Sequence, residues 1–154
     1  DLGCGIGRNL VHLDRFGVGV DHNAHSVKIA CERGCAAFTP EEFRRSEAAS
    51  PGSFDALLAA HVLEHMPLDE ATALVGEYLD FVRPGGRVVL ITPQEAGYRS
   101  DPSHVEHLDF DALAKLLAEL RLEPVRSYSF PFPRFAGRWF VHNEFVVVGR
   151  KAAA

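Results

Sequence analysis

The first nine residues hold three glycines at alternate positions behind an acid, in the order Asp1-Leu2-Gly3-Cys4-Gly5-Ile6-Gly7-Arg8-Asn9. Glycines let the backbone adopt φ > 0 and let a ligand approach the main chain without meeting a Cβ atom. Leu10, Leu13 and Phe16 follow at helical spacing, so we expect the glycine turn to lead into a helix over residues 8–16. The N-terminus of such a helix suits a nucleotide-like ligand. The alternative is a turn in which the glycines serve only sterics.

A second acid closes the next apolar run. Residues 17–21 read Gly-Val-Gly-Val-Asp, which is typical of a short strand ending at Asp21. His22 follows, and Asn23 or Ser26 is expected to cap a helix that extends to about Gly34.

Histidines follow the ends of later apolar runs, at His61, His65, His104 and His107. A histidine with a near-neutral pKa can remove a proton from a hydroxyl or an amine. We assign a catalytic role to His104 and His107, with loop hydrogen bonding as the alternative, and expect His65 to pack or to form a hydrogen bond at a strand–helix junction. His104-Val105-Glu106-His107 has the residue types of a metal site, but no third ligand occurs at a suitable spacing, so no metal is predicted.

The elements that must position these residues alternate between strands and helices. We expect strands at 17–21, 35–38, 54–60, 87–93, 122–130 and 144–151, helices at 23–34, 69–82 and 109–120, a helix starting at Thr39-Pro40, and a polar loop at 94–108. This alternation predicts right-handed crossovers and a parallel sheet, whose ligands bind beyond the carboxyl ends of the strands. The last two strands have no helix between them, which predicts one antiparallel strand near the edge.

Length and composition limit the alternatives. The chain has 154 residues, which predicts a single domain over 1–154. A net charge of −5 gives no indication of a nucleic-acid or membrane partner. No apolar run approaches the roughly 20 residues of a membrane span. Cys4, Cys31 and Cys35 are expected to be reduced thiols of a cytoplasmic protein. Because only two residues precede Gly3, we expect the first strand to be truncated here and the N-terminal part of the domain to be missing.

Taken in this order, the motifs resemble those of the class I S-adenosylmethionine-dependent methyltransferases. The signature Asp-x-Gly-x-Gly-x-Gly corresponds to residues 1–7, and Asp21 matches the acid that ends the second strand. The segments FDALLAAHVLEHM and VRPGGRVVLITP match the regions of the fourth and fifth strands, and residues 144–151 match the terminal antiparallel strand. The resemblance implies an α/β fold with a doubly wound, mostly parallel, seven-stranded Rossmann-like sheet. A nicotinamide-dependent oxidoreductase fits less well, because its G-x-G-x-x-G fingerprint would place a glycine at Arg8.

The resemblance also implies the cofactor and its site. S-adenosylmethionine is expected as methyl donor, with S-adenosylhomocysteine as product. Asp1 would organise the glycine loop and the cofactor's ammonium group, Asp21 would accept both ribose hydroxyls, and Ala60-His61 would flank the methionine portion. Thr39, Glu41 or Glu42 would meet the adenine amino group. The full set of expected cofactor-binding residues is Asp1, Gly3, Cys4, Gly5, Gly7, Asp21, His22, Asn23, Thr39, Ala60 and His61.

The predicted function is methyl transfer to an O or N nucleophile of a small-molecule acceptor. The alternative from another class is a methyltransferase-like binding or regulatory module without turnover. The aromatic residues between Tyr128 and Phe140 are expected to form core or an interface, such as that of a homodimer, rather than to line a substrate pocket.

Overall fold

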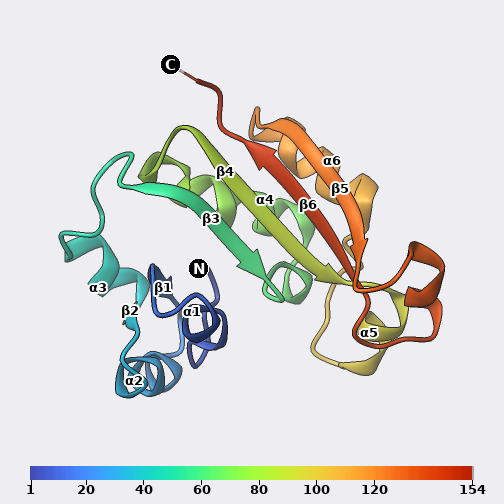
Figure 1. The fold of residues 1–154 in the computed structure, drawn as a ribbon, viewed down its shortest axis with the longest axis horizontal. Coiled ribbons are helices and arrows are strands. Elements are labelled where there is room, and N and C mark those ends of the chain that lie inside the picture. The colour runs from blue at the N-terminus through green and yellow to red at the C-terminus, as the bar shows by residue number, and fades with distance from the viewer. Residues whose placement is uncertain (154) are drawn as a thin grey trace.

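The computed structural model describes residues 1–153, which form an α/β fold with short helices packed around twisted strands (Figure 1). In chain order the elements are α1 (Arg8–His12), β1 (Val18–Val20), α2 (Ala24–Glu32), β2 (Ala36–Phe38), α3 (Pro40–Arg45), β3 (Phe54–Ala60), α4 (Leu68–Tyr78), β4 (Val82–Pro93), α5 (Glu95–Ser100), α6 (Phe110–Glu119), β5 (Glu123–Phe130) and β6 (Glu144–Arg150). Single 3₁₀ turns occur at Leu63–His65, Leu79–Phe81 and Arg134–Arg138.

The strands form a parallel pair, β1–β2, and a mixed four-stranded sheet in the order β3-β4-β6-β5. Leu2 connects the two, because it makes isolated parallel bridges to Val20 and to Ala59. The expected antiparallel strand is β6, which pairs antiparallel with β4 and with the edge strand β5. The expected continuous seven-stranded sheet is not formed, since Leu2 alone stands between β1 and β3 in the residues described.

Two apolar clusters hold these elements together. In the larger cluster, Val88 and Leu90 of β4 and Phe145 of β6 are fully buried with Val75 of α4 and Leu113 of α6. These two helices lie behind the four-stranded sheet in Figure 1. The smaller cluster lies between the glycine loop, α1, α2 and β2 with the residue before it, and is formed by Cys4, Leu10, Val27, Ala30, Cys35 and Ala37.

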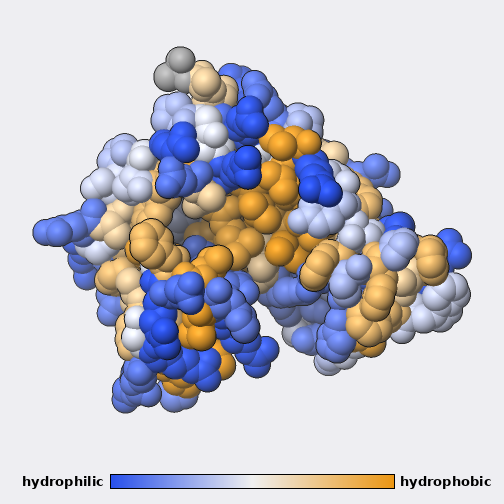
Figure 2. Space-filling view, viewed as in Figure 1, coloured by the Kyte–Doolittle hydropathy of each residue, from blue (hydrophilic) through white to orange (hydrophobic). Residues whose placement is uncertain are grey.

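The facing surface of the four-stranded sheet remains partly open. Leu58, Val89 and Ile91 alternate along β3 and β4 with fully buried neighbours and are only half-buried. Figure 2 shows apolar residues gathered over this part of the sheet, with polar residues on the surrounding helices.

Several expected boundaries are confirmed and others are wrong. The cap of α2 is Asn23, whose side chain accepts from two N–H groups of the first turn. The helix over 8–16 is shorter than expected: it ends at His12 because Asp14 and Arg15 adopt positive φ, and Phe16 is 89% exposed. The predicted loop at 94–108 contains α5. The predicted helix over 69–82 ends as α4 at Tyr78.

None of the helices within residues 1–153 combines the length and the apolar character that crossing a membrane requires. Cys4 and Cys35 are buried and Cys31 is exposed, and all three are free thiols.

Candidate functional site

The glycine loop has the backbone geometry that the sequence predicts. Gly3, Gly5 and Gly7 adopt φ values of 66°, 50° and 77°, a region that other residues rarely occupy. A Cβ atom at Gly3 would lie 2.6 Å from a methyl group of Val62, so this glycine lets the loop pack against the segment after β3. A Cβ atom at Gly5 would meet nothing within 4 Å, so this glycine faces open space that a ligand can enter.

Asp1 brings an acceptor oxygen to this loop. Its Oδ1 accepts a hydrogen bond of 3.3 Å from the side-chain amide of Asn9 in α1. Its Oδ2 is buried and has no hydrogen-bond partner among residues 1–153. A buried carboxylate oxygen without a donor is costly, so it favours a ligand that supplies an N–H or O–H group.

Asp21 is buried at the end of β1, where its side chain fastens the loop. Its Oδ2 accepts from the backbone N–H of Gly5 at 2.8 Å, and its Oδ1 accepts from the backbone N–H of Asn23 at 2.8 Å. Each carboxylate oxygen can accept a second hydrogen bond, so Asp21 keeps acceptor capacity for ligand hydroxyl groups.

The other residues expected near the cofactor have varied surroundings. The side chain of His22 is exposed, and that of Asn23 caps α2. The Cys4 side chain packs in the smaller core cluster, so only its backbone can face a ligand. Thr39 caps α3 in a capping box with Glu42, in which each side chain bonds the other's backbone N–H. The N–H of Asp21 bonds the carbonyl of Phe38, so Thr39 follows directly on the strand beside Asp21.

A pocket of about 410 Å³ opens beside the loop, at the carboxyl ends of β1 and β3. Its lining includes Gly3, Asp21, Pro40, Val62 and His65. This is the edge at which ligands of parallel sheets bind. It therefore brings together residues from the glycine loop, from β1 and from the segment after β3.

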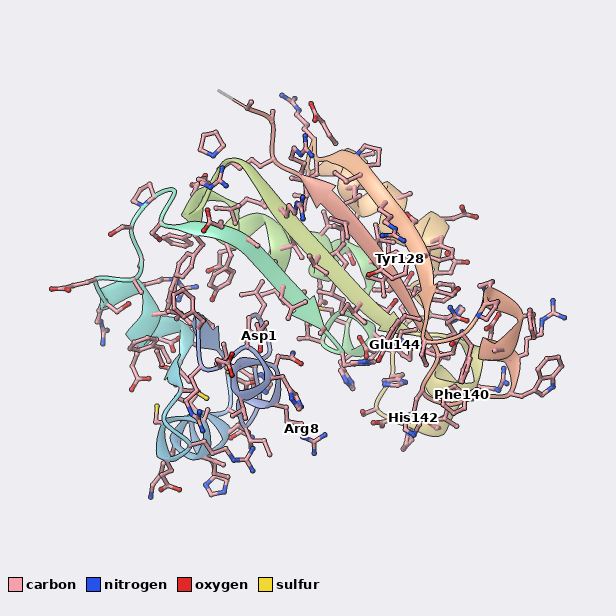
Figure 3. All side chains as sticks on the ribbon, in the orientation of Figure 1. Asp1, Arg8, Tyr128, Phe140, His142 and Glu144 are labelled. Carbon is pink, nitrogen blue, oxygen red and sulfur yellow. The ribbon has the colours of Figure 1, made fainter. Side chains whose placement is uncertain are left out.

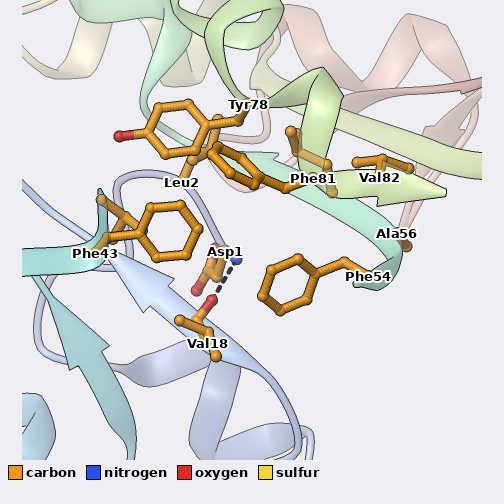
Figure 4. A pocket seen from close by; sticks show the side chains of 11 residues that line it. Asp1, Leu2, Val18, Phe43, Phe54, Ala56, Tyr78, Phe81 and Val82 are labelled. Atoms are coloured by element: carbon orange, nitrogen blue, oxygen red, sulfur yellow. Dashed lines mark hydrogen bonds between the residues drawn. The ribbon is translucent and has the colours of Figure 1, made fainter. Parts of the chain in front are cut away.

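A second pocket lies at the opposite ends of the strands. Figure 4 shows this apolar pocket of about 40 Å³, where Val18 and Phe54 begin β1 and β3 and where Phe43 and Tyr78 meet. A dashed line marks the hydrogen bond of 2.9 Å from the backbone nitrogen of Asp1 to the carbonyl of Val18. Its small volume and its position at the amino ends of the strands make it a packing gap rather than a ligand site.

His61 follows Ala60, the last residue of β3, and adopts φ 56°. A positive φ at a residue other than glycine stores strain and often marks a functional site. Its Nε2 lies 2.8 Å from Oε1 of Glu144, and its Nδ1 lies 3.3 Å from Oε1 of Glu64. The hydrogen bond to Glu144, followed by the contact with Glu64, raises the pKa of His61 to about 9. The imidazole is therefore protonated at neutral pH and is not a general base there.

The antiparallel direction of β6 explains why Glu144 reaches this edge. Glu144 begins β6 and pairs with Pro93 at the end of β4. Figure 3 shows Asp1 and Glu144 on either side of the end of β3 in this view, with Phe140 and His142 farther out. Neither Glu144 nor Glu64 was predicted as a site residue. The Leu-Glu-His segment held a signal for Glu64, whereas only the sheet order places Glu144.

The two histidines that were assigned to catalysis are in different surroundings. His104 has its Nε2 3.9 Å from Oε1 of the buried Glu64, and its Nδ1 lies 2.8 Å from the carbonyl of Tyr98. His107 packs edge-on against the rings of Tyr98 and Phe145, and its buried Nε2 has no partner in the described chain. His104 thus joins the group around Glu64, and His107 belongs to the packing beneath it.

The aromatic segment after β5 is not core. Its large side chains are exposed, with Trp139 at 74% exposure and Phe135 at 64%. Gln94 holds both ends of the segment, because its buried side-chain amide forms hydrogen bonds with Ser129, with Asn143 and with the carbonyl of Glu144. The prediction of core packing is therefore wrong for these residues, because they lie in and directly after an exposed 3₁₀ turn, Arg134–Arg138. The interface alternative stays a prediction.

The residues at the carboxyl edge fit a nucleoside with a cationic amino-acid tail. The loop offers open space at Gly5 and an unpartnered acceptor at Asp1, and Asp21 offers acceptor capacity at the end of the next strand. Glu64 and Glu144 add two carboxylates, against the one imidazolium of His61.

Comparisons with known proteins agree with this geometry. The family model described as "Methyltransferase domain" matches residues 1–145. A SAM-dependent methyltransferase from Methanosarcina mazei superposes with a TM-score of 0.73 at 18% identity, over 100% of this chain and 92% of that one. Magnesium protoporphyrin IX methyltransferase from Synechocystis, solved with bound SAM, gives a TM-score of 0.69 at 17% identity, over 99% and 68%.

A third similar structure is the 1,6-didemethyltoxoflavin-N1-methyltransferase of Burkholderia thailandensis, solved with 1,6-didemethyltoxoflavin and S-adenosylhomocysteine. It gives a TM-score of 0.66 at 20% identity, over 98% of this chain and 70% of that one. No curated protein sequence matches the chain significantly.

Proposed function

The chain belongs to the methyltransferase domain family and is an S-adenosylmethionine-dependent methyltransferase, and from that premise we propose that it methylates an oxygen or nitrogen atom of a small-molecule acceptor. The observation that carries the proposal is the buried, unpartnered Oδ2 of Asp1 in a loop whose Gly5 faces open space. The acceptor is proposed to be small because the solved methyltransferases with this fold include enzymes named for a porphyrin and for a toxoflavin precursor.

Each residue at the edge then has a task that its geometry supports. S-adenosylmethionine supplies a methyl group that is already activated on a sulfonium sulfur, so the protein mainly has to position the acceptor and exclude water. Asp1 accepts a hydrogen bond from the ammonium group of the cofactor. Asp21 accepts hydrogen bonds from the ribose hydroxyls and also holds the loop through the N–H of Gly5. Glu64 and Glu144 make the end of β3 a favourable place for a cationic ligand.

The acceptor side is proposed to lie at His65 and His104. His65 lines the same pocket as Gly3 and Asp21, and its ring centroid lies 4.9 Å from that of His104. His104 has its Nε2 3.9 Å from Oε1 of Glu64 and its Nδ1 bound to a backbone carbonyl. The Nε2 of His107 is instead buried against aromatic rings, so we assign acceptor binding to His104.

Calorimetry with S-adenosylhomocysteine tests the proposal first. We expect one-to-one binding by the folded chain, and a weaker constant for Asp1→Asn, which replaces the unpartnered oxygen with an amide. Turnover on a panel of hydroxyl- and amine-bearing small molecules, followed as release of S-adenosylhomocysteine, then separates an enzyme from a module that binds the cofactor without turnover. A folded preparation that binds no S-adenosylhomocysteine contradicts the proposal.

The exposed aromatic segment is proposed to be a contact between two copies of the chain. Phe132, Phe135 and Trp139 present a large apolar surface that is distinct from the pocket at Gly3 and Asp21. Light scattering after size exclusion is expected to show a dimer that Trp139→Ser weakens. A monomer at high protein concentration contradicts this assignment.

A further inference from the structure

Three potential metal ligands meet beside the candidate cofactor pocket. Glu64, His65 and His104 each offer one ligand atom, and these atoms lie within 4.8 Å of one another. Glu64 is only 1% exposed, and neither of its carboxylate oxygens has a hydrogen-bond partner within residues 1–153. Such a buried carboxylate is costly unless a cation or a donor compensates it.

The hydrogen bonds of the two histidines decide which ring nitrogen is free. Nδ1 of His104 lies 2.8 Å from the carbonyl of Tyr98, and Nδ1 of His65 lies 3.2 Å from the carbonyl of Ser103. A carbonyl can only accept, so each Nδ1 carries the proton. The hydroxyl of Ser103 donates to Asp101 at 2.7 Å and does not change this assignment. In the neutral rings the lone pairs are therefore on the two Nε2 atoms.

This pattern is the one that metal-binding histidines usually show. A histidine that binds a metal through one nitrogen commonly donates from the other to a carbonyl or a carboxylate, which fixes its tautomer and orientation. Here two histidines share that arrangement, and the Nε2 of His104 faces Glu64 at 3.9 Å. Nothing in the hydrogen-bonding of the cofactor loop accounts for it.

We propose that Glu64, His65 and His104 bind a divalent first-row transition metal such as Zn²⁺. Two imidazoles and one carboxylate favour such ions over Mg²⁺ and Ca²⁺, which prefer oxygen ligands. Ligand atoms that each lie about 2.1 Å from one ion are roughly 3–4 Å apart. Small side-chain rotations would therefore bring the three ligand atoms from their present separations to metal-binding distances. Three protein ligands leave at least one coordination position open.

The imidazolium of His61 offers the competing explanation for the buried carboxylate. Its Nδ1 lies 3.3 Å from Oε1 of Glu64, but the contact lacks the direction of a hydrogen bond, and its Nε2 is bound to Glu144. His61 therefore compensates one side of Glu64 only. It leaves Oε2 of Glu64 without a partner, and a metal held by Glu64, His65 and His104 accounts for that oxygen.

The open coordination position of the metal also restricts the chemical class of the acceptor. This part of the inference rests on the proposed function. His65 lines the pocket with Gly3 and Asp21, so the metal site borders the cofactor pocket. A metal held there by Glu64, His65 and His104 would supply a Lewis acid that lowers the pKa of an acceptor hydroxyl and orients it. The hydroxyl proton leaves to solvent, the oxygen forms a bond to the methyl carbon, and the bond from that carbon to the sulfonium breaks with its electron pair on sulfur. The acceptor is thereby an oxygen nucleophile.

The test titrates the full chain, freed of metals by a chelator, with Zn²⁺ by calorimetry and with Co²⁺ by visible absorption. We expect one tight site, with the absorption of nitrogen- and oxygen-coordinated Co²⁺, and a loss of affinity of at least about tenfold in both Glu64→Gln and His104→Ala. His12→Ala, which removes an exposed histidine on α1, is the matched control and keeps the wild-type constant.

Three experimental outcomes would contradict the metal site. They are the absence of binding, binding that the control variant weakens as much as the ligand variants do, and binding that Glu64→Gln and His104→Ala leave unchanged, which means adventitious surface binding only. S-adenosylhomocysteine binding is measured on the same samples without metal. If the metal site fails but His104→Ala still binds S-adenosylhomocysteine, the proposed function stands. If the wild type does not bind S-adenosylhomocysteine, the result counts against the proposed function instead. Circular dichroism establishes that both ligand variants are folded.

Discussion

The carboxylate of Asp21 accepts the backbone N–H of Gly5 at 2.8 Å, and its other oxygen accepts the N–H of Asn23. The acid at the end of β1 thus connects the glycine loop to the first turn of α2. Its proposed role in binding is therefore partly indirect, because the side chain that is proposed to bind the ribose hydroxyls also holds the glycine loop in place.

Asp21→Ala is accordingly expected to weaken S-adenosylhomocysteine binding by roughly 1.5–3 kcal/mol, the range for hydrogen bonds to a charged acceptor. This corresponds to about 10- to 150-fold in the dissociation constant. Asp21→Asn keeps one acceptor oxygen and should lose less. Calorimetry measures both constants, and an unchanged constant for Asp21→Ala would show that the acid has been misassigned.

Gly5→Ala and Gly19→Ala form a matched pair, because Gly5 faces open space where a ligand can bind and Gly19 faces packed core atoms. A methyl group at Gly5 enters open space and adds only backbone strain, about 1–2 kcal/mol for a positive φ. We expect this variant to stay folded and to lose S-adenosylhomocysteine binding. A methyl group at Gly19 would lie 2.6 Å from the Cys4 sulfur, so Gly19→Ala should lower the free energy of unfolding by about 1–3 kcal/mol. Urea unfolding measures the stability of both variants, and calorimetry measures their S-adenosylhomocysteine binding. Equal effects of the two substitutions in both assays would contradict the prediction.

The cysteines should differ in reactivity with pH. Burial, assisted by the nearby negative charge of Asp21, raises the pKa of the Cys4 thiol to about 11. Because the thiolate is the reactive form, Cys4 stays unmodified by iodoacetamide at pH 8, and its thiolate forms only as the pH rises toward 11. Exposed Cys31 is modified at pH 8. Mass spectrometry of peptides from the native protein measures both, and rapid alkylation of Cys4 at pH 8 would contradict the described packing.

Thr39→Ala removes the cap of α3. The hydroxyl oxygen of Thr39 accepts from the N–H of Glu42, and such caps contribute about 0.5–2 kcal/mol. For a chain of this length a loss of 1 kcal/mol lowers Tm by roughly 2–4 °C. Thr39→Ser retains the acceptor and should keep most of the stability. A Tm of Thr39→Ala equal to that of the wild type would show that the cap does not contribute, and S-adenosylhomocysteine binding by the same variants tests the proposed contact of Thr39 with adenine.

Much of the cofactor edge was predictable from the sequence, because its determinants are local. The positive φ of Gly3, Gly5 and Gly7, the cap at Asn23 and the capping box at Thr39 all depend on neighbouring residues. The end of the first helix was not, since the helical spacing of Leu13 and Phe16 continues past His12 although Asp14 and Arg15 adopt positive φ.

The acceptor side was not predictable, because its determinants are distant in the sequence. Glu64 and His104 come together only when the segment after β4 folds back, where the N–H groups of Val105 and Glu106 bond the carbonyl of Glu64. Glu144 reaches His61 because β6 runs antiparallel to β4. The spacing of these residues along the chain could not indicate either contact, so the sequence predicted no third metal ligand near His104.

Gln94 is the polar side chain on which this distant assembly depends. It is fully buried after β4, donates to Ser129 Oγ and to the carbonyl of Glu144, and accepts from Asn143. Gln94→Leu removes the acceptor of the 2.9 Å hydrogen bond from the Asn143 amide and the donor to the carbonyl of Glu144, so we expect a loss of about 1–3 kcal/mol in the free energy of unfolding. Ser129→Ala removes only one half-buried partner and should cost less. Urea unfolding of the two variants measures the difference, and an equal or smaller loss for Gln94→Leu would mean that the strand pairing of β6 alone holds Glu144 at the end of β3.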